Sequence, residues 1–327
     1  IVLDRSAFDL VGHDPAQFDG EPLRPYNAAP DALLLNFKSV VMGFVPDPGA
    51  GVAHIQYDPP MAGVQRPDSV ALAASGTGCG DWRGALRAEL SDPLRTTFQG
   101  AYAASCGERS WAVAYADPQA FAARAVEGMW RALGGKLTGS VRDGKVPAGL
   151  QPAFSVTSPP LAAVVRDVNK FSNNVMAQHV FLTMALQKNG VATWEGARDV
   201  LRQWWLQRFG AEGQPVTDNG AGLSREARIS AQALGRMLQA AWQSPVMPEL
   251  VASLPVAGID GTLRRSTSRA GSAHLKTGSL RDVLAVAGYV HADDGRRYVL
   301  VAIVNHAQAA AARPVLDALI DWTANTP

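Results

Sequence analysis

Residues 273–304 read AHLKTGSLRDVLAVAGYVHADDGRRYVLVAIV. Apolar and β-branched residues in this stretch predict three strands, over Ala273 to Lys276, Val283 to His291 and Arg297 to Val304. Asp293-Asp294-Gly295 is typical of a tight turn, so the last two strands are expected to form an antiparallel hairpin. A helical pattern from Ala309 to Trp322 closes the chain.

The remaining sequence is helical in its later part and β-rich in its earlier part. Four amphipathic helices are predicted, over Phe121 to Leu133, Asn173 to Asn189, Glu195 to Phe209 and the residues after Ser230 up to Trp242. Gly and Pro clusters separate shorter β-type runs, at Ala32 to Val45, Val70 to Ala74 and Trp111 to Tyr115. We therefore expect an α+β (mixed α/β) protein, with a β-rich domain at 1–115 and a domain at 116–327 that has an antiparallel sheet with helices on its faces.

The composition excludes several classes of protein. The 327 residues carry a net charge of only +1, which argues against a generally basic surface for nucleic acid. The longest apolar runs, such as Val283 to Val290, fall far short of the roughly 18 to 20 residues that span a bilayer, so no transmembrane segment is expected. Neither a metal nor another cofactor is predicted, because none of the six histidines has metal-ligand spacing: His13, His54, His179, His274, His291 and His306.

Two short motifs suggest chemistry when they are taken together. Lys276-Thr277-Gly278-Ser279 lies on the first predicted strand of the closing sheet, and Ser172-Asn173-Asn174 lies where a helix begins, 104 positions before Lys276. Either motif alone occurs by chance, and Ser-Asn-Asn is also an ordinary helix N-cap. An S-x-N followed by a K-T-G is the second and third part of the three-motif signature of penicillin-binding proteins and serine β-lactamases.

Longer blocks around these motifs resemble a specific family. They are VVRDVNKFSNNVMAQ at 164–178, DNGAGLSR at 218–225, SLPVAGIDGTL at 253–263, KTGSL at 276–280 and Gly288-Tyr289. In order and spacing they resemble the penicillin-binding protein 4 family, the low-molecular-mass class C D-alanyl-D-alanine carboxypeptidases. Cys79-Gly80-Asp81-Trp82 and its neighbours resemble the domain that this family inserts within its catalytic domain. The resemblance implies a β-lactamase/transpeptidase-like catalytic domain with a β-rich insertion.

The resemblance also implies an acyl-transfer site. A serine would attack the penultimate D-Ala carbonyl, an oxyanion would form, and the leaving D-Ala amine would need a proton. Ser172 would relay that proton, and Lys276 would hold Ser172 in place and favour the substrate's terminal carboxylate. Thr277 would give this carboxylate a hydroxyl donor, and Asn174 would hydrogen-bond the substrate's peptide backbone.

Four further residues are expected to contact the substrate. Gly278 would let the substrate lie along the strand as an added strand, and the Ser279 backbone N–H would form half of the oxyanion hole. Lys170 matches the family and would face the cleft, the alternative being a solvated lysine at a helix end. Glu21 stands near the family's acidic residue that reads the substrate's free amino group, the alternative being an exposed surface carboxylate.

No serine in the chain is followed three residues later by lysine, although the family's S-x-x-K motif supplies the nucleophile and its base. In the family this motif precedes the inserted domain, and Ile1-Val2-Leu3-Asp4 reads as the middle of a strand. We therefore expect the chain to begin after the motif. The expected activity is that of a carboxypeptidase/endopeptidase on peptidoglycan stem peptides, inhibited by β-lactam antibiotics. The alternatives are a β-lactamase and a non-catalytic peptidoglycan-binding protein that lacks the nucleophile.

The two cysteines, Cys79 and Cys106, lie 27 positions apart. The residues alone leave open whether they form one disulfide or remain two buried thiols. The family has a similar pair and acts outside the cytoplasm, so the resemblance implies a disulfide and a periplasmic location in the bacterial cell envelope. The oligomeric state stays open, with a homodimer among the options.

Overall fold

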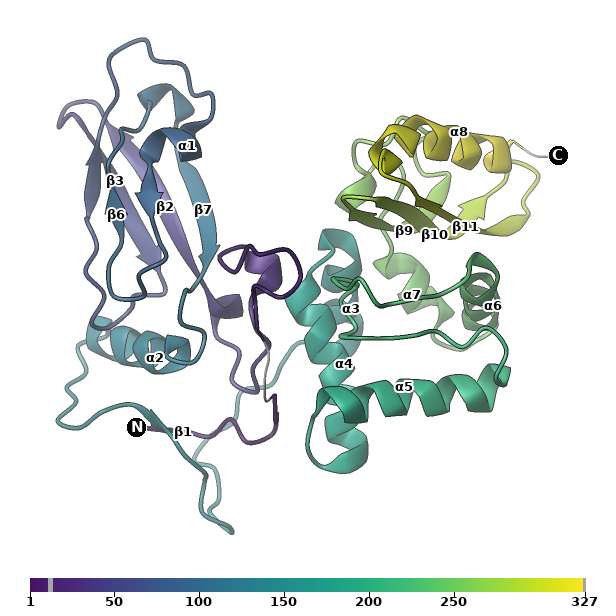
Figure 1. The fold of residues 1–327 in the computed structure, drawn as a ribbon, viewed down its shortest axis with the longest axis horizontal. Coiled ribbons are helices and arrows are strands. Elements are labelled where there is room, and N and C mark those ends of the chain that lie inside the picture. Colours follow the sequence, from purple (N-terminus) through teal and green to yellow (C-terminus); the bar gives the residue numbers. More distant parts are fainter. Residues whose placement is uncertain (11–13, 326–327) are drawn as a thin grey trace. The chain divides into compact units, whose positions relative to one another are not determined.

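The computed structural model of the protein describes residues 1–10 and 14–325, so His13 lies outside the described residues. The chain divides into two units, Ile1–Gln151 and Pro152–Pro327, whose elements are labelled in Figure 1. The division therefore falls after Gln151 and not after residue 115 as predicted. The helix α2 (Phe121–Ala132) belongs to the first unit.

An antiparallel sheet in the order β4-β3-β2-β7 forms the centre of the first unit. Its strands are β2 (Ser39–Asp47), β3 (Val52–Asp58), β4 (Ser69–Ala71) and β7 (Arg109–Ala114). Met42 and Phe44 lie two residues apart on one face of β2 and are buried, and Phe44 stacks on Tyr102 with ring centroids 5.5 Å apart. The short elements of this unit are β1 (Val2–Leu3), β5 (Ala88–Glu89), β6 (Thr97–Phe98), β8 (Arg142–Asp143) and α1 (Trp82–Leu86).

Packing explains why α2 and β8 belong to the first unit. Phe121 and Ala125 of α2 are fully buried in a cluster with Met61. A Cβ at Gly128 would lie only 1.9 Å from the Pro60 carbonyl oxygen, so glycine is needed where this helix approaches the backbone. β8 pairs in parallel with β1, which joins residues about 140 positions apart. Such long-range contacts leave no mark in the local sequence pattern.

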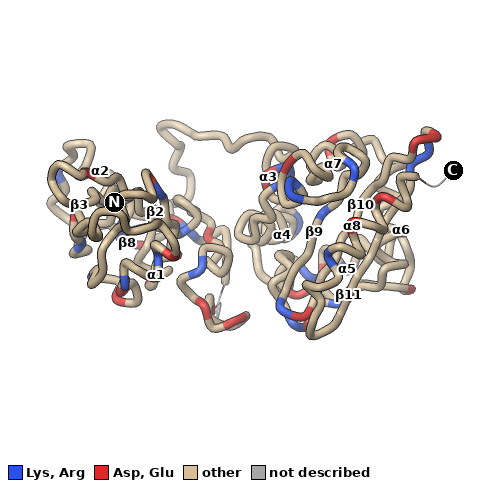
Figure 2. The backbone as a smooth tube through the Cα atoms, turned by 90° about the horizontal axis from the view of Figure 1, so that it is seen from above, with Lys and Arg blue, Asp and Glu red and all other residues tan. Residues whose placement is uncertain are grey.

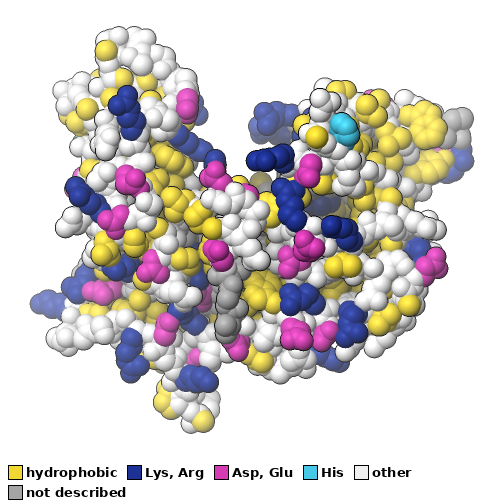
Figure 3. Space-filling model, in the orientation of Figure 1, with side chains coloured by type: hydrophobic (Ala, Val, Ile, Leu, Met, Phe, Trp, Pro, Cys, Tyr) yellow, Lys and Arg dark blue, Asp and Glu magenta, His cyan; other side chains and the backbone are white. Residues whose placement is uncertain are grey.

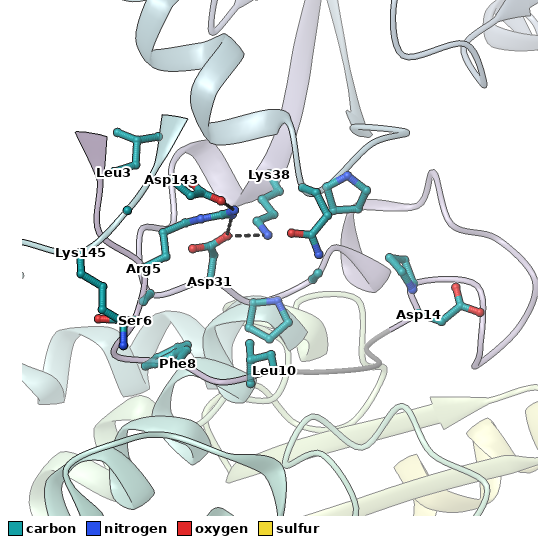
Figure 4. Close-up of a pocket in the computed structure, with 17 residues that line it drawn as sticks. Leu3, Arg5, Ser6, Phe8, Leu10, Asp14, Asp31, Lys38, Asp143 and Lys145 are labelled. Atoms are coloured by element: carbon teal, nitrogen blue, oxygen red, sulfur yellow. Dashed lines mark hydrogen bonds and ion pairs between the residues drawn. The ribbon is translucent and has the colours of Figure 1, made fainter. Parts of the chain in front are cut away.

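A buried ion network lies on the wall of a cavity of about 590 Å³ in the first unit (Figure 4). Lys38 Nζ and Arg5 Nη1 each lie 2.7 Å from Asp31 Oδ2, and Arg5 also pairs with Asp143. Burial acts to raise the pKa of Asp31, but the hydrogen bond and charge of Lys38 outweigh it, so the pKa is lowered. The carboxylate thus stays ionised between two cations.

A three-stranded antiparallel sheet in the order β11-β10-β9 forms the centre of the second unit. The strands are β9 (Ala273–Leu280), β10 (Val283–His291) and β11 (Arg297–Asn305). The helix α8 (Arg313–Ala324) covers one face of this sheet, and α6 (Ala231–Trp242) packs on the other (Figure 1). A Cβ on Gly288 would lie 2.2 Å from the His274 carbonyl oxygen, which explains a glycine at the centre of β10. The three predicted strands and the closing helix are confirmed.

Five helices precede the sheet, namely α3 (Leu161–Phe171), α4 (Asn174–Asn189), α5 (Trp194–Phe209), α6 and α7 (Met247–Ser253). The predictions of α4, α5 and α6 are confirmed, and side chains of Asn173, Thr193 and Ser230 cap their N-termini. The sequence did not predict α3 or α7. Neither begins with a side-chain cap, and α3 contains three valines, which are poor helix formers.

Acidic and basic residues are interspersed along both units (Figure 2), in agreement with the small net charge. None of the helices within residues 1–10 and 14–325 is long and apolar enough to cross a membrane.

The structure joins Cys79 and Cys106 in a disulfide, which confirms the pair that the resemblance implied. A loop with a sequence separation of 27 should stabilise the folded state by about 3 to 4 kcal/mol in the chain-entropy model. We expect reduction, or the double change Cys79→Ala and Cys106→Ala, to lower the free energy of unfolding by this amount in urea denaturation. Ellman titration of the unreduced protein is expected to find no thiol, and two free thiols would contradict the pairing.

Candidate active site

Ser172 lies at the turn between α3 and α4. It adopts the left-handed conformation, with φ 54° and ψ 46°, and its N–H donates to the Val168 carbonyl at the end of α3. The Asn173 side chain accepts the Met176 N–H at 3.0 Å and so caps α4. Because Asn173 does the capping, the Ser172 and Asn174 side chains are left for other contacts.

Lys276 meets Ser172 as predicted. Its Nζ donates to Ser172 Oγ at 2.9 Å and to the Thr277 carbonyl oxygen at 2.7 Å. Burial lowers the pKa of Lys276 to about 8, because the charged form is poorly solvated there. Near neutral pH this amine can therefore exchange a proton more readily than an exposed lysine.

The strand β9, which carries the K-T-G motif, lies at the edge of its sheet with β10 on one side only. The Leu275 N–H points away from β10 and donates to the Pro255 carbonyl at 2.9 Å. Since N–H groups alternate in direction along a strand, those of Thr277 and Ser279 face the same outer edge. This direction is the one that the predicted oxyanion role of Ser279 requires.

Gly278 has space around it. A Cβ there would touch only the Ala285 Cβ, at 3.7 Å, which is an ordinary contact. The fold itself therefore does not demand glycine at this position. The expected reason for it, close approach of a substrate strand, stays a prediction.

Asn174 and Thr277 each contact a residue to which the sequence analysis gave no role. Asn174 Nδ2 donates to the Ala221 carbonyl oxygen at 3.0 Å, and the Thr277 and Thr262 hydroxyl oxygens lie 2.8 Å apart. Both partners lie inside the family-like blocks at 218–225 and 253–263. Their place in those blocks was the only signal that could have pointed to them.

Lys170 is enclosed by protein acceptors. Its Nζ lies 2.6 Å from the Leu254 carbonyl oxygen and 2.8 and 2.6 Å from the two carboxylate oxygens of Asp260. An ammonium has three donors, so all three are used here. The alternative of a solvated helix-end lysine is wrong, because the Lys170 side chain is only 12% exposed, and its predicted contact with substrate stays a prediction.

The segment 253–263 follows α7 in the chain and contacts both α3 and β9. Besides holding Lys170, it accepts the Leu275 N–H at Pro255 and places Thr262 against Thr277. Gly261 has φ +55°, and a Cβ there would lie 2.7 Å from the Lys170 carbonyl oxygen, so glycine permits this close packing. The two motifs are thus held together by a third segment of the chain.

A cavity of about 740 Å³ adjoins the two motifs and is lined by Ser172, Thr277, Gly278 and Ser279. Three exposed arginines line it as well, namely Arg264, Arg265 and Arg313. Asp317 is the acidic residue among the described lining residues, and it accepts hydrogen bonds from Ser266 and Thr267. Figure 3 shows several basic side chains on the face of the second unit that it presents. The excess of positive charge suits a ligand with a carboxylate.

Other predicted groups lie apart from these contacts. Glu21 belongs to the first unit, where it is exposed and lies 3.4 Å from Arg24, so its substrate role stays a prediction. Nδ1 of His179 lies 2.8 Å from the Val175 carbonyl oxygen, and Nδ1 of His274 lies 3.1 Å from the Val251 carbonyl oxygen. No group of three or more His, Cys, Asp or Glu among the described residues is arranged to hold a metal ion.

The fold is similar to that of penicillin-binding protein 4 (dacB) from Haemophilus influenzae. The match has a TM-score of 0.71 at 20% identity and covers 98% of this chain and 74% of that chain. A second structure of that protein, complexed with a β-lactam, matches with a TM-score of 0.63 at 20% identity over 87% of this chain and 69% of that chain. The class of fold is therefore penicillin-binding and transpeptidase-like, with an extra domain.

The chain belongs to the D-Ala-D-Ala carboxypeptidase 3 (S13) family, whose model matches residues 1–326. The D-alanyl-D-alanine carboxypeptidase of Actinomadura sp. (strain R39) is 31% identical over 205 residues, or 58% of this chain and 37% of that relative. The D-alanyl-D-alanine carboxypeptidase DacB of H. influenzae is 27% identical over 207 residues, or 60% of this chain and 42% of that relative. The chain thus matches about two fifths of the length of these relatives, and the family resemblance is confirmed.

The lowered pKa of Lys276 predicts a pH dependence of stability. Between its folded pKa of about 8 and its ordinary value of 10.5 the unfolded chain binds more protons, so this group should make the free energy of unfolding rise with pH. We expect Lys276→Met to remove that rise in urea denaturation at pH 7 to 10.5. Lys188→Met, at an exposed position of α4, is the control and should retain it. A rise of equal size in Lys276→Met would contradict the assignment.

Removing the Asp260 carboxylate charge should weaken the junction between α3 and β9. Asp260→Asn leaves the Lys170 ammonium, 12% exposed, without its counter-charge. Because Asp260 itself is 41% exposed, we expect a loss of only about 1 to 2 kcal/mol in the free energy of unfolding. Asp199→Asn breaks an exposed pair with Arg202 and should cost less than about 0.5 kcal/mol. Equal effects of the two changes would argue against a special role for Asp260.

Proposed function

We propose that this chain provides the S-x-N and K-T-G side of the active site of a serine D-alanyl-D-alanine carboxypeptidase. Its substrates would be peptidoglycan stem peptides, and it would also cut peptide cross-links. The contact between Lys276 Nζ and Ser172 Oγ, beside the outer edge of β9, carries this proposal. Membership of the family supports it, as does the β-lactam complex of the related Haemophilus protein.

The chemistry would proceed by acyl transfer. A nucleophilic serine attacks the penultimate D-Ala carbonyl carbon and loses its proton to a base, and the N–H of Ser279 stabilises the oxyanion. The C–N bond to the terminal D-Ala then breaks, and Ser172, held by Lys276, relays a proton to the leaving amine. Water finally attacks the acyl ester and frees the serine. The arginines of the cavity wall attract the terminal carboxylate.

Asn174 would orient the substrate. Its Nδ2 already donates to Ala221, which leaves the side-chain oxygen Oδ1 to accept an N–H from the substrate backbone. The Cys79–Cys106 disulfide supports an oxidising compartment, and we propose the periplasm. Because the 327 residues contain no S-x-x-K, we propose that the nucleophile and its base come from outside this segment.

Labelling with fluorescent penicillin tests the proposed function. Residues 1–327 should form no covalent adduct on denaturing gels, because acylation needs an activated nucleophile, whereas the longest protein that the gene encodes should be labelled. In that longer protein Lys276→Ala should slow labelling about a hundredfold or more, and Lys188→Ala should not change it.

Labelling of residues 1–327 would mean that a serine of this segment is the nucleophile. An unlabelled but folded longer protein would favour non-catalytic peptidoglycan binding, and rapid turnover of penicillin would favour a β-lactamase. Each of these results would overturn the proposed function.

A further inference from the structure

Thr277 and Lys276 leave the strand β9 on opposite faces. Val286, the partner of Thr277 in the ladder between β9 and β10, lines the cavity of about 740 Å³, and so does Thr277 itself. Because successive side chains of a strand alternate between its two faces, Lys276 lies on the other face, where its Nζ reaches Ser172 Oγ. The threonine of the K-T-G motif therefore presents its side chain on the cavity side of the strand.

Thr262 is a hydrogen-bond partner of the Thr277 hydroxyl. The two Oγ1 atoms lie 2.8 Å apart, and Thr262 lines the same cavity. A hydroxyl has one hydrogen to donate, so only one of the two threonines donates within the pair. If Thr277 donated to Thr262, its single hydrogen would be used and could not serve a ligand. If Thr262 donates, the hydrogen of Thr277 is available to an acceptor in the cavity.

The charges of the cavity wall favour a negatively charged acceptor. Two exposed arginines from the segment after the threonine, Arg264 and Arg265, line the cavity. The Asp317 carboxylate, which lines it too, already accepts the hydroxyl hydrogens of Ser266 and Thr267, at 2.7 and 2.8 Å. A ligand carboxylate would therefore meet two guanidiniums and a hydroxyl whose hydrogen is available, which are the donors that suit it.

The backbone on both sides of Thr262 is packed. Thr262 is the middle residue of the short 3-10 helix η4 (Gly261–Leu263). Before it, Gly261 packs so closely on the Lys170 carbonyl oxygen that a Cβ would lie 2.7 Å away. After it, Leu263 is buried in the core between the sheet and α8. The Thr262 side chain itself is exposed, so its hydroxyl is held in place without being part of the core.

We propose that Thr262 is a positioning residue for recognition of the substrate's terminal carboxylate. Its hydroxyl donates to Thr277 Oγ1, and Thr277 in turn donates to the carboxylate. Consecutive hydrogen bonds polarise one another, so the bond from Thr277 to the carboxylate is stronger when Thr262 donates. Thr262 also restricts rotation of the Thr277 hydroxyl, so less freedom is lost when the substrate binds. The inference rests on the proposed function, in which the substrate ends in a carboxylate.

Hydrolysis of the stem-peptide mimic diacetyl-L-Lys-D-Ala-D-Ala by the longest protein that the gene encodes tests this role. Thr262→Val keeps the shape of the side chain but removes the hydroxyl, and KM should rise about fivefold, the worth of one neutral hydrogen bond. Because the carboxylate is bound in the ground state and the transition state alike, kcat should change less than about twofold. Thr262→Ser retains a hydroxyl and should keep the original KM. Thr183→Val, at an exposed position of α4, is the control and should leave both constants unchanged.

A double-mutant cycle separates an action through Thr277 from a direct contact of Thr262 with the substrate. In a Thr277→Val background, adding Thr262→Val should raise KM less than about twofold, because the partner hydroxyl is already gone. A further rise of about fivefold would mean that Thr262 acts independently of Thr277, and this result would overturn the inference. An unchanged KM in Thr262→Val alone, or an equal rise in Thr262→Ser, would overturn it as well. Circular dichroism verifies that the variants are folded.

Labelling of the unaltered longer protein with fluorescent penicillin distinguishes the two levels of failure. A protein that is labelled and hydrolyses the peptide, but whose variants give the contrary results, overturns the role of Thr262 alone. A protein that is neither labelled nor active on the peptide overturns the proposed function, and the role of Thr262 with it.

Discussion

A half-buried cation joins the helices to the sheet in the second unit. Lys170, at the end of α3, is held by Asp260 and the Leu254 carbonyl, and the same segment pairs with the start of β9 at Pro255. Ser172 lies two residues after Lys170, and Lys276 lies one residue after Leu275. The separation of the two motif side chains is therefore set by this junction, and their contact depends on it.

Much of the fold could be predicted because its signals are local. The runs of apolar and β-branched residues and the Asp293-Asp294-Gly295 turn identified the hairpin. Capping residues such as Ser230 marked the starts of helices. The boundary between the units could not be predicted in this way. It depends on contacts such as those of Phe121 with Met61, which only the folded chain brings together. A helix such as α3, with valines and no side-chain cap, carries little local signal of its own.

The site was predictable to the extent that residue type and order carry chemistry. A serine and a lysine in two motifs of known order indicated Ser172 and Lys276, and the structure brings them within 2.9 Å. Asp260 and Thr262 could not be recognised by type, because aspartate and threonine are common on surfaces and in turns. Their importance comes from the neighbours that the fold gives them, Lys170 and Thr277.

The outer edge of β9 also bears on self-association. Strand edges with unpaired backbone groups pair with strands of other molecules, and proteins limit this with charged residues and with breaks in β propensity. Here three arginines line the cavity that adjoins this edge. Two copies approaching edge to edge would bring like charges together. The arginines that suit a ligand with a carboxylate would thus also disfavour pairing of this edge with a second copy.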